Sequence, residues 1–285
     1  MSRKYFLIGL FLLVSILWLM VWQMPDRRTH LIFCDVGQGD AILLTQGKTQ
    51  VLIDGGPDEK VLDCLAKNLP FWDRTLEVVA LTHPEADHLT GLISVLEKYR
   101  VKYFLTGPGE NDSDVSTALA FKLQTQNLKP IRLTAGSFIK VGGEVLKVLW
   151  PPKGRFGQLN ELSLVLLWQS ESGSALLMGD ADSKIQDDLL LLEEIPRVDL
   201  LKFPHHGSKT GLREDFLAAV KPKEAVISVG KNSFGQPAIE ALDLLKKYKV
   251  KIHRTDQEGE IEYTFPPSGN LGSRSSFSGS ANSLR

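Results

Sequence analysis

The segment LTHPEADHLTG, residues 81–91, decides how we interpret the rest of the chain. An apolar run typical of a β-strand, residues 78–81, comes before it, and a helical pattern of apolar residues begins at Leu89. The loop between them carries four potential metal ligands within six residues: His83, Glu85, Asp87 and His88. Imidazole nitrogens and carboxylate oxygens together suit Zn²⁺ or Mn²⁺. A solvated loop that happens to be polar is the alternative interpretation.

Two later strands end in residues of the same chemistry. Asp180 follows the apolar run 175–178, and the pair His205-His206 follows the run 198–202. Loops at the ends of buried strands often carry chemistry, because the strands beneath them form a rigid scaffold. If the three strand ends converge, they supply enough ligands for one or two divalent metal ions. We therefore predict a metal centre there.

The order of the predicted elements is repeated. Residues 41–54 predict a hairpin that ends in an acidic turn, and residues 164–180 predict another. Each hairpin is followed by a helix, a strand and a histidine loop. Two β-rich halves with helices on their outer faces predict an α/β fold, a four-layer αββα sandwich with its active cleft along one edge. Chance similarity between short apolar strands is the competing explanation.

The first residues predict a membrane anchor. Residues 5–23 form an almost unbroken apolar run of about the length needed to cross a bilayer. A cleaved signal peptide is the alternative, but the run is long for one and has no small-residue cleavage site. Arg3 and Lys4 favour a cytoplasmic N-terminus, which would place the rest of the chain outside the cytoplasm. Arg27 and Arg28 favour the opposite orientation.

Composition divides the chain into three predicted segments. An anchor over residues 1–28 is followed by one predicted domain, residues 29–267, and by a tail rich in serine, glycine and asparagine, residues 268–285, which we expect to be disordered. The formal net charge of −1 gives no overall attraction to nucleic acid, and leaves a local basic patch open. Cys34 and Cys64 could pair, but two thiols do not identify a compartment.

Together, these motifs resemble a known family. HPEADH, residues 83–88, resembles the HxHxDH signature of the metallo-β-lactamase fold. DVGQGD at 35–40, DGG at 54–56, MGD at 178–180 and PHHGS at 204–208 look like the hydrolase domain of ComEC-type DNA-uptake proteins. The resemblance runs from about residue 31 to residue 265. It implies an αββα hydrolase with one or two metal ions.

The resemblance also implies which side chains bind metal. One ion would be bound by His83 and Glu85. The other would be bound by Asp87, His88 and His205, and Asp180 would bridge the two.

The sequence departs from this family in three respects. Glu85 stands where the wider fold has histidine, which makes that site harder and more tolerant of Mn²⁺ or Mg²⁺. Gln236 stands where we expect the histidine of an FGHP motif, so a substrate or metal contact would be lost. The many membrane helices of the uptake channel have no counterpart beside the single predicted anchor.

Two side chains have predicted roles in the chemistry itself. Two metal ions would lower the pKa of a shared water and clamp a phosphate, and Asp87 could orient that water. His206 is the candidate for protonating the leaving oxygen or binding phosphate, with a core histidine as the alternative.

The remaining candidates are contacts and supports. Ser208 is expected to open a helix, either as its N-cap or as part of an anion site. Asp54 is expected to hold the loops by hydrogen bonds. Asn160 and Ser163 precede a strand and are candidate substrate contacts. Asp35 and Asp40 flank a glycine turn and are expected to be structural, with contact to the site as the alternative.

We therefore hypothesise a membrane-anchored, metal-dependent phosphodiesterase, a DNase acting outside the cytoplasm. In ComEC-type proteins this domain is proposed to degrade the strand that is not imported, so the resemblance implies a nucleic acid substrate and a DNA-uptake channel as partner. Hydrolysis of another ester or amide, such as a lactone or a choline phosphoester, is a second hypothesis. A binding module that has lost turnover is a third, motivated by Glu85 and Gln236.

Overall fold

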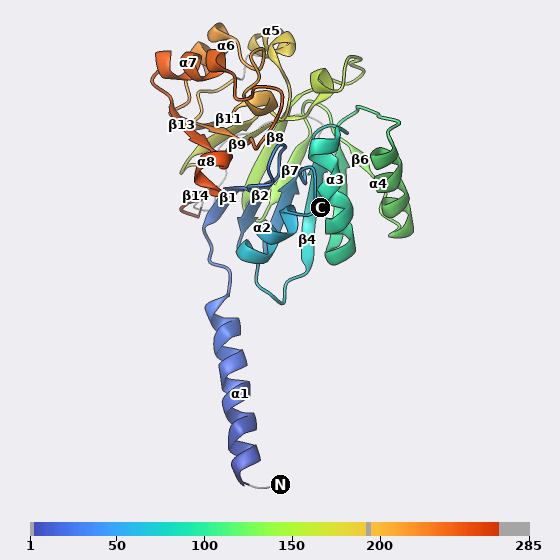
Figure 1. Cartoon of the computed structure of the whole chain (residues 1–285), viewed down its shortest axis with the longest axis vertical. Coiled ribbons are helices and arrows are strands. Elements are labelled where there is room, and N and C mark those ends of the chain that lie inside the picture. The colour runs from blue at the N-terminus through green and yellow to red at the C-terminus, as the bar shows by residue number, and fades with distance from the viewer. Residues whose placement is uncertain (1–2, 192–194, 268–285) are drawn as a thin grey trace, which may run out of the picture.

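The protein consists of a long N-terminal helix and a domain built on two β-sheets (Figure 1). The structure is a computed structural model that describes residues 3–191 and 195–267. The tail expected at 268–285 lies outside the described residues.

Helix α1 (Arg3–Trp22) extends away from the domain (Figure 1). Its residues Arg3–Val21 have a mean hydropathy of 2.2, and none of this segment is buried. With a rise of 1.5 Å per residue, its 20 residues extend about 30 Å, which matches the hydrocarbon core of a bilayer. The helix is therefore long and apolar enough to span a membrane.

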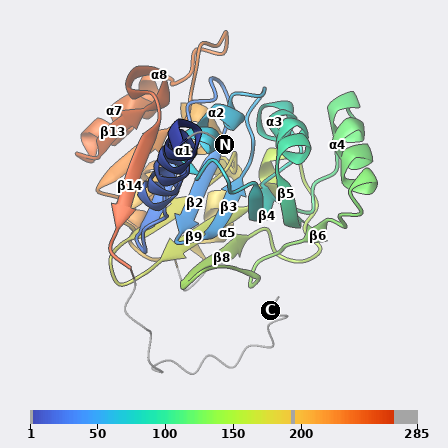
Figure 2. The same cartoon turned by 90° about the horizontal axis from the view of Figure 1, so that it is seen from below.

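Each sheet has seven strands. The first contains, in spatial order, β14 (Ile261–Phe265), β1 (Thr29–Phe33), β2 (Ile42–Gln46), β3 (Thr49–Ile53), β4 (Thr75–Leu81), β5 (Arg100–Thr106) and β6 (Ile131–Arg132), an order that Figure 2 shows from below. The second contains β13 (Lys251–Arg254), β12 (Glu224–Ile227), β11 (Leu200–Lys202), β10 (Ser174–Leu177), β9 (Val165–Gln169), β8 (Glu144–Trp150) and β7 (Phe138–Val141).

The two sheets pack face to face through an apolar layer that includes Phe33, Leu166 and Trp168. The outer face of the first sheet is covered by α2 (Val61–Asn68), α3 (Ala86–Lys98) and α4 (Asp114–Thr125). The second sheet is covered by α5 (Gln186–Leu190), α6 (Glu214–Val220) and α7 (Ile239–Lys247). The predicted αββα sandwich is confirmed.

The predicted repeat is also present. In each half an antiparallel hairpin is followed by a strand that pairs in parallel with the second strand of that hairpin: β3 with β4, and β10 with β11. The loops that follow β4 and β11 leave the same edge of the sandwich, because Asp87 of the first loop lies 3.2 Å from His206 of the second. This edge carries the candidate site.

Some elements differ from the prediction. The sequence analysis missed β7 and the short helix α8 (Thr255–Glu258). The expectation that Ser208 opens a helix is wrong, because residues 204–207 form a 3₁₀ turn and α6 begins only at Glu214. A Cβ on Gly211 would lie 2.8 Å from the carbonyl oxygen of Pro204, so this glycine permits the tight turn in between.

A disulfide joins Cys34, directly after β1, to Cys64 in α2. Both cysteines are buried. The pairing that the sequence left open is therefore present, and it ties the first sheet to the helix that covers it.

Candidate metal centre

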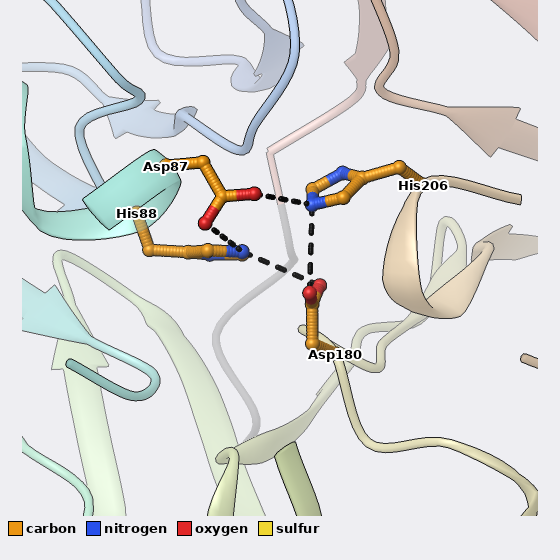
Figure 3. Close-up of side chains that lie close together, drawn as sticks. All are labelled: Asp87, His88, Asp180 and His206. Carbon is orange, nitrogen blue, oxygen red and sulfur yellow. Dashed lines mark ion pairs between the residues drawn. The ribbon is translucent and has the colours of Figure 1, made fainter. Parts of the chain in front are cut away.

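Four side chains from three loops meet at the shared edge. Asp87 and His88 lie at the start of α3, Asp180 follows β10, and His206 lies in the turn after β11 (Figure 3). The Nε2 atom of His206 is 3.2 Å from Asp87 Oδ2 and 3.4 Å from Asp180 Oδ2. The Nε2 atom of His88 is 3.3 Å from Asp180 Oδ1. One ligand atom from each residue lies within 4.8 Å of all the others, so one metal ion could contact all four.

Three histidines share the same hydrogen-bonding pattern. The Nδ1 atom of each ring forms a hydrogen bond within the protein. His88 bonds with Asp54 Oδ2 at 2.9 Å, His206 with the Ser228 carbonyl at 3.0 Å, and His83 with Thr82 Oγ1 at 3.1 Å. The hydroxyl of Thr82 donates to Asp54, so it accepts from His83. These contacts place the proton on Nδ1 and leave the Nε2 lone pair directed into the site, as metal-binding histidines require.

Among the described residues, the atoms that face the centre have no hydrogen-bond partner. They are Nε2 of His83, His88 and His206 and both carboxylate oxygens of Asp180. All of these residues are almost fully buried, and a buried polar atom without a partner costs free energy. Nitrogen and carboxylate donors in this arrangement fit a divalent ion of the Zn²⁺ or Mn²⁺ type.

A second potential group shares Asp180. His83 Nε2 lies 3.9 Å from Glu85 Oε2 and 4.0 Å from Asp180 Oδ2, and the three residues form a separate cluster of possible ligands. Glu85 is more exposed than the others, with 36% of its side chain accessible. The arrangement therefore offers one buried four-residue group and a more open three-residue group.

The structure places His206, not His205, in the four-residue group. The backbone of both residues is left-handed, with φ values of 51° and 52°, so the chain turns sharply and the two rings face different ways. His205 Nε2 is 4.0 Å from Asp180, and 30% of its side chain is exposed. Left-handed φ in non-glycine residues is costly and is concentrated at functional sites. The four-residue group therefore contains His206 and not the predicted His205.

Asp54 connects the two histidines of the first loop. Its Oδ1 accepts from the Thr82 amide at 2.7 Å, and its Oδ2 accepts from the Thr82 hydroxyl at 2.8 Å and from His88. Asp54 also has left-handed backbone, with φ of 59°, as the following glycines pack against α3. A Cβ on Gly91 of α3 would overlap the carbonyl oxygen of Gly55, which explains why glycine is required at this contact.

Lys202 and Asp40 lie beside the centre, and the sequence analysis did not assign Lys202 to it. Lys202 is fully buried at the end of β11, and its ammonium contacts the carboxylate of Asp40. It also donates to the Gly179 carbonyl at 3.0 Å and lies 3.8 Å from Asp180 Oδ1. Asp40, which we expected to be structural beside a glycine turn, is 3.6 Å from His206 Nδ1. A lysine inside an apolar run was the available signal, because a buried ammonium requires a carboxylate partner.

The other candidates are distributed around this centre. Ser163 is fully buried and accepts from the Asp180 amide at 3.1 Å, so it supports a ligand and does not face solvent. Asn160 begins a 3₁₀ turn, and its buried Oδ1 atom has no hydrogen-bond partner. Ser208 bonds with Thr210 in the turn beyond the site. Gln236 accepts from Gln38 at 2.7 Å, which links the two glycine loops.

The charges of the centre balance one another. Burial lowers the pKa of His206, but the negative charge and close approach of Asp180 and the close approach of Asp87 outweigh this effect and raise the pKa to about 9. Burial likewise lowers the pKa of His88, and the charges of Asp180 and Asp54 raise it well above its usual value. Burial raises the pKa of Asp87, while the close approach of His206 and the charge of His88 bring it down to about 2. Protonated imidazoles therefore balance the carboxylates in the metal-free chain, and a divalent cation would displace these protons.

The architecture matches solved structures. YhfI from Bacillus subtilis, a metallo-beta-lactamase fold protein, aligns over 82% of this chain and 100% of its own, with a TM-score of 0.55 and 12% identity. Zn²⁺-bound PqqB from Methylobacterium extorquens aligns over 82% and 99%, with a TM-score of 0.55 and 12% identity. The chain has the metallo-β-lactamase fold. No protein-family model matches it.

Sequence relatives of this metallo-β-lactamase-fold chain agree with the motifs. It is 27% identical over 256 residues to ComE operon protein 3 of Bacillus subtilis and 28% identical over 236 residues to Recombination protein 2 of Haemophilus influenzae. Each match covers 81% of this chain but only 32% and 28% of the relative, so the chain spans about a third of their length. The predicted resemblance to ComEC-type proteins is confirmed.

Proposed function

We propose that the protein is a membrane-anchored, metal-dependent phosphodiesterase that cleaves DNA strands outside the cytoplasm. The observation that carries the proposal is the set of buried histidines whose Nε2 atoms, without hydrogen-bond partners, point at the carboxylates of Asp87 and Asp180. Two relatives that cover this region are named for a com operon and for recombination, which agrees with a nucleic acid substrate. A DNA-uptake channel remains the proposed partner.

We assign the ligands by proximity. Asp87, His88, Asp180 and His206 would hold one ion, and His83, Glu85 and Asp180 would hold a second. Zn²⁺ or Mn²⁺ suits these donors, and Glu85 makes the second position the harder of the two. A bound ion would supply Lewis acidity that activates water and stabilises charge on a phosphate.

The chain itself positions the reaction. Asp54 orients His88 directly and His83 through Thr82, while Ser163 holds the Asp180 amide. Asp87 is only partly buried and remains ionised, so it can accept a hydrogen bond from an attacking water and orient it.

His205 takes the role first predicted for His206. Its side chain is 30% exposed beside Asp180, so it can reach a phosphate oxygen or protonate a leaving group. Asn160, whose buried Oδ1 atom has no hydrogen-bond partner among the described residues, is the proposed polar substrate contact.

Two observations support a location outside the cytoplasm. Helix α1 is long and apolar enough to span a membrane. The Cys34–Cys64 disulfide is of the kind that persists in oxidising compartments and is rare in the cytosol. Protease added to intact cells or spheroplasts tests this orientation: digestion of the domain before lysis is expected, and protection until lysis would place the domain inside.

Activity is tested on the full chain in mild detergent, stripped of metal and then supplied with Mn²⁺ or Zn²⁺. We expect cleavage of single-stranded DNA that chelator abolishes, and loss of cleavage in Asp87→Ala and His88→Ala with unchanged circular dichroism. His253→Ala is the matched control, because this histidine contacts Glu224 and Glu258 and not the centre. Cleavage that persists in His88→Ala would refute the assignment.

The same assay compares the two adjacent histidines. His206→Ala should lose bound metal, whereas His205→Ala should retain metal and turn over more slowly. Hydrolysis of a lactone or choline phosphoester with no cleavage of DNA would favour another hydrolase. A chain that purifies without metal and hydrolyses nothing would favour the binding module.

A further inference from the structure

Two exposed aromatic side chains lie on the side of the domain that faces α1. Phe71 and Trp72 occupy the turn between α2 and β4, with exposures of 49% and 37%, and their rings are 4.9 Å apart in an edge-to-face arrangement. In Figure 1 this turn is the lowest part of the domain, beside the upper end of α1. Large apolar groups gathered on a surface usually mark a contact.

The turn lies at the level where the apolar helix ends. The Phe71 amide donates to the Gln23 side chain at 3.1 Å, and Gln23 is the residue directly after α1. If α1 spans a bilayer, this level is the interface between hydrocarbon and water. Tryptophan is enriched at that depth because its ring has an apolar body and one polar N–H.

Cations lie on the same edge of the domain. Arg100 begins β5 and donates its amide to the Arg74 carbonyl, in the segment that follows the aromatic pair. Lys98 ends α3 next to it, and both Lys98 and Arg100 are exposed. Juxtamembrane cations are attracted to anionic lipid headgroups. Aromatic and cationic groups on one edge are the combination that a lipid surface binds.

We infer that the Phe71–Trp72 turn inserts into the interfacial layer of the bilayer and forms a second membrane contact beside α1. This inference rests on the proposed anchoring by α1. Two contacts would fix the tilt of the domain. Strand β4 runs from this turn to the histidine loop, and its seven residues extend about 20 Å, so the metal centre would stand above the membrane and face solution.

The test uses Trp72 as a reporter of depth in the full chain, reconstituted in phosphatidylcholine and phosphatidylglycerol vesicles. Trp18→Phe and Trp22→Phe remove the tryptophans of α1, and the remaining Trp150 and Trp168 are buried. Subtracting the spectrum of the same chain with Trp72→Phe isolates Trp72. We expect lipids with brominated acyl chains to quench most of this signal, and aqueous iodide to leave it nearly unchanged.

A matched control places a tryptophan at the opposite edge. Phe234 is 76% exposed in the loop beyond β12, so Phe234→Trp combined with Trp72→Phe should respond to iodide and not to brominated lipid. Quenching of Trp72 by iodide alone would overturn the inference. Protection from both quenchers would also overturn it, because protein, such as a second copy of the chain, would then cover the turn.

Extraction with alkaline carbonate separates this inference from the anchoring on which it depends. A chain that stays in the vesicles while Trp72 responds only to iodide is anchored without the second contact. A chain that leaves the vesicles is not anchored by α1, and the inference falls with the anchor.

Discussion

Replacing Lys202 by methionine tests how the metal centre is held together. The change removes the ammonium but keeps a long unbranched side chain of similar shape. Asp40, which is 1% exposed, then loses the cation that its carboxylate contacts, and the Gly179 carbonyl loses its donor. Breaking a buried ion pair on one side typically costs about 3–5 kcal/mol, a large part of the roughly 5–15 kcal/mol that stabilises a domain.

A second change should reverse much of this loss. Lys202→Met combined with Asp40→Asn leaves no uncompensated charge, so we expect the double variant to be about 1–3 kcal/mol more stable than Lys202→Met alone. Lys209→Met is the matched control, because the Lys209–Glu240 pair is exposed and should contribute less than about 1 kcal/mol.

The assay is urea unfolding of the metal-free chain in mild detergent, followed by near-ultraviolet circular dichroism. The reasoning fails if Lys202→Met costs no more than Lys209→Met. It also fails if the double variant is no more stable than Lys202→Met, since the buried carboxylate would then not be the source of the loss.

Three further predictions concern the ligands. Asp54→Asn should weaken metal binding by about 10–100-fold, because the amide cannot accept all three hydrogen bonds that orient the histidine loop. Metal titration measures the affinity, and an unchanged value would show that Asp54 does not orient the ligands. Glu85→His should shift the preference from Mn²⁺ toward Zn²⁺ in a competition titration, and an unchanged preference would mean that residue 85 does not bind metal. In the metal-free chain, the raised pKa of His206 stabilises the fold fully below about pH 6.5, and this contribution should be lost as the pH rises toward about 9. The free energy of unfolding of His206→Gln should depend less on pH across that window than that of the unchanged chain. Equal slopes would exclude His206 as the source of the pH dependence.

The local sequence pattern was sufficient to predict the part of the site whose residues are close together in the chain. Residues 83–88 form one strand-to-helix loop, so their proximity follows from the sequence, and Asp180 was found because it ends an apolar run. The hairpin repeat led to the two sheets for the same reason. Strand β7 could have been found too, since the glycine pair 142–143 between two alternating runs is a hairpin signal.

Features of the site that depend on tertiary structure could not be predicted from the sequence. His205 and His206 are adjacent and chemically identical, and only the left-handed backbone determines which ring faces the carboxylates. Lys202 and Asp40 are distant in sequence, and their pairing depends on the packing of β11 against the glycine loop before β2. Ser208 has the composition of an N-cap, but the tight turn that follows delays the next helix to Glu214.

The division of the ligands between the two halves has a consequence for the lifetime of the chain. Asp87 and His88 belong to the first half and Asp180 and His206 to the second, so an ion bound by all four would act as a cross-link between the sheets. It would close the loop of about 90 residues between His88 and Asp180. An ion present at about 100 times its dissociation constant would add about 2.7 kcal/mol to the free energy of unfolding. The concentration of free metal around the cell would then determine how long the domain resists unfolding and proteolysis, even when no substrate is present.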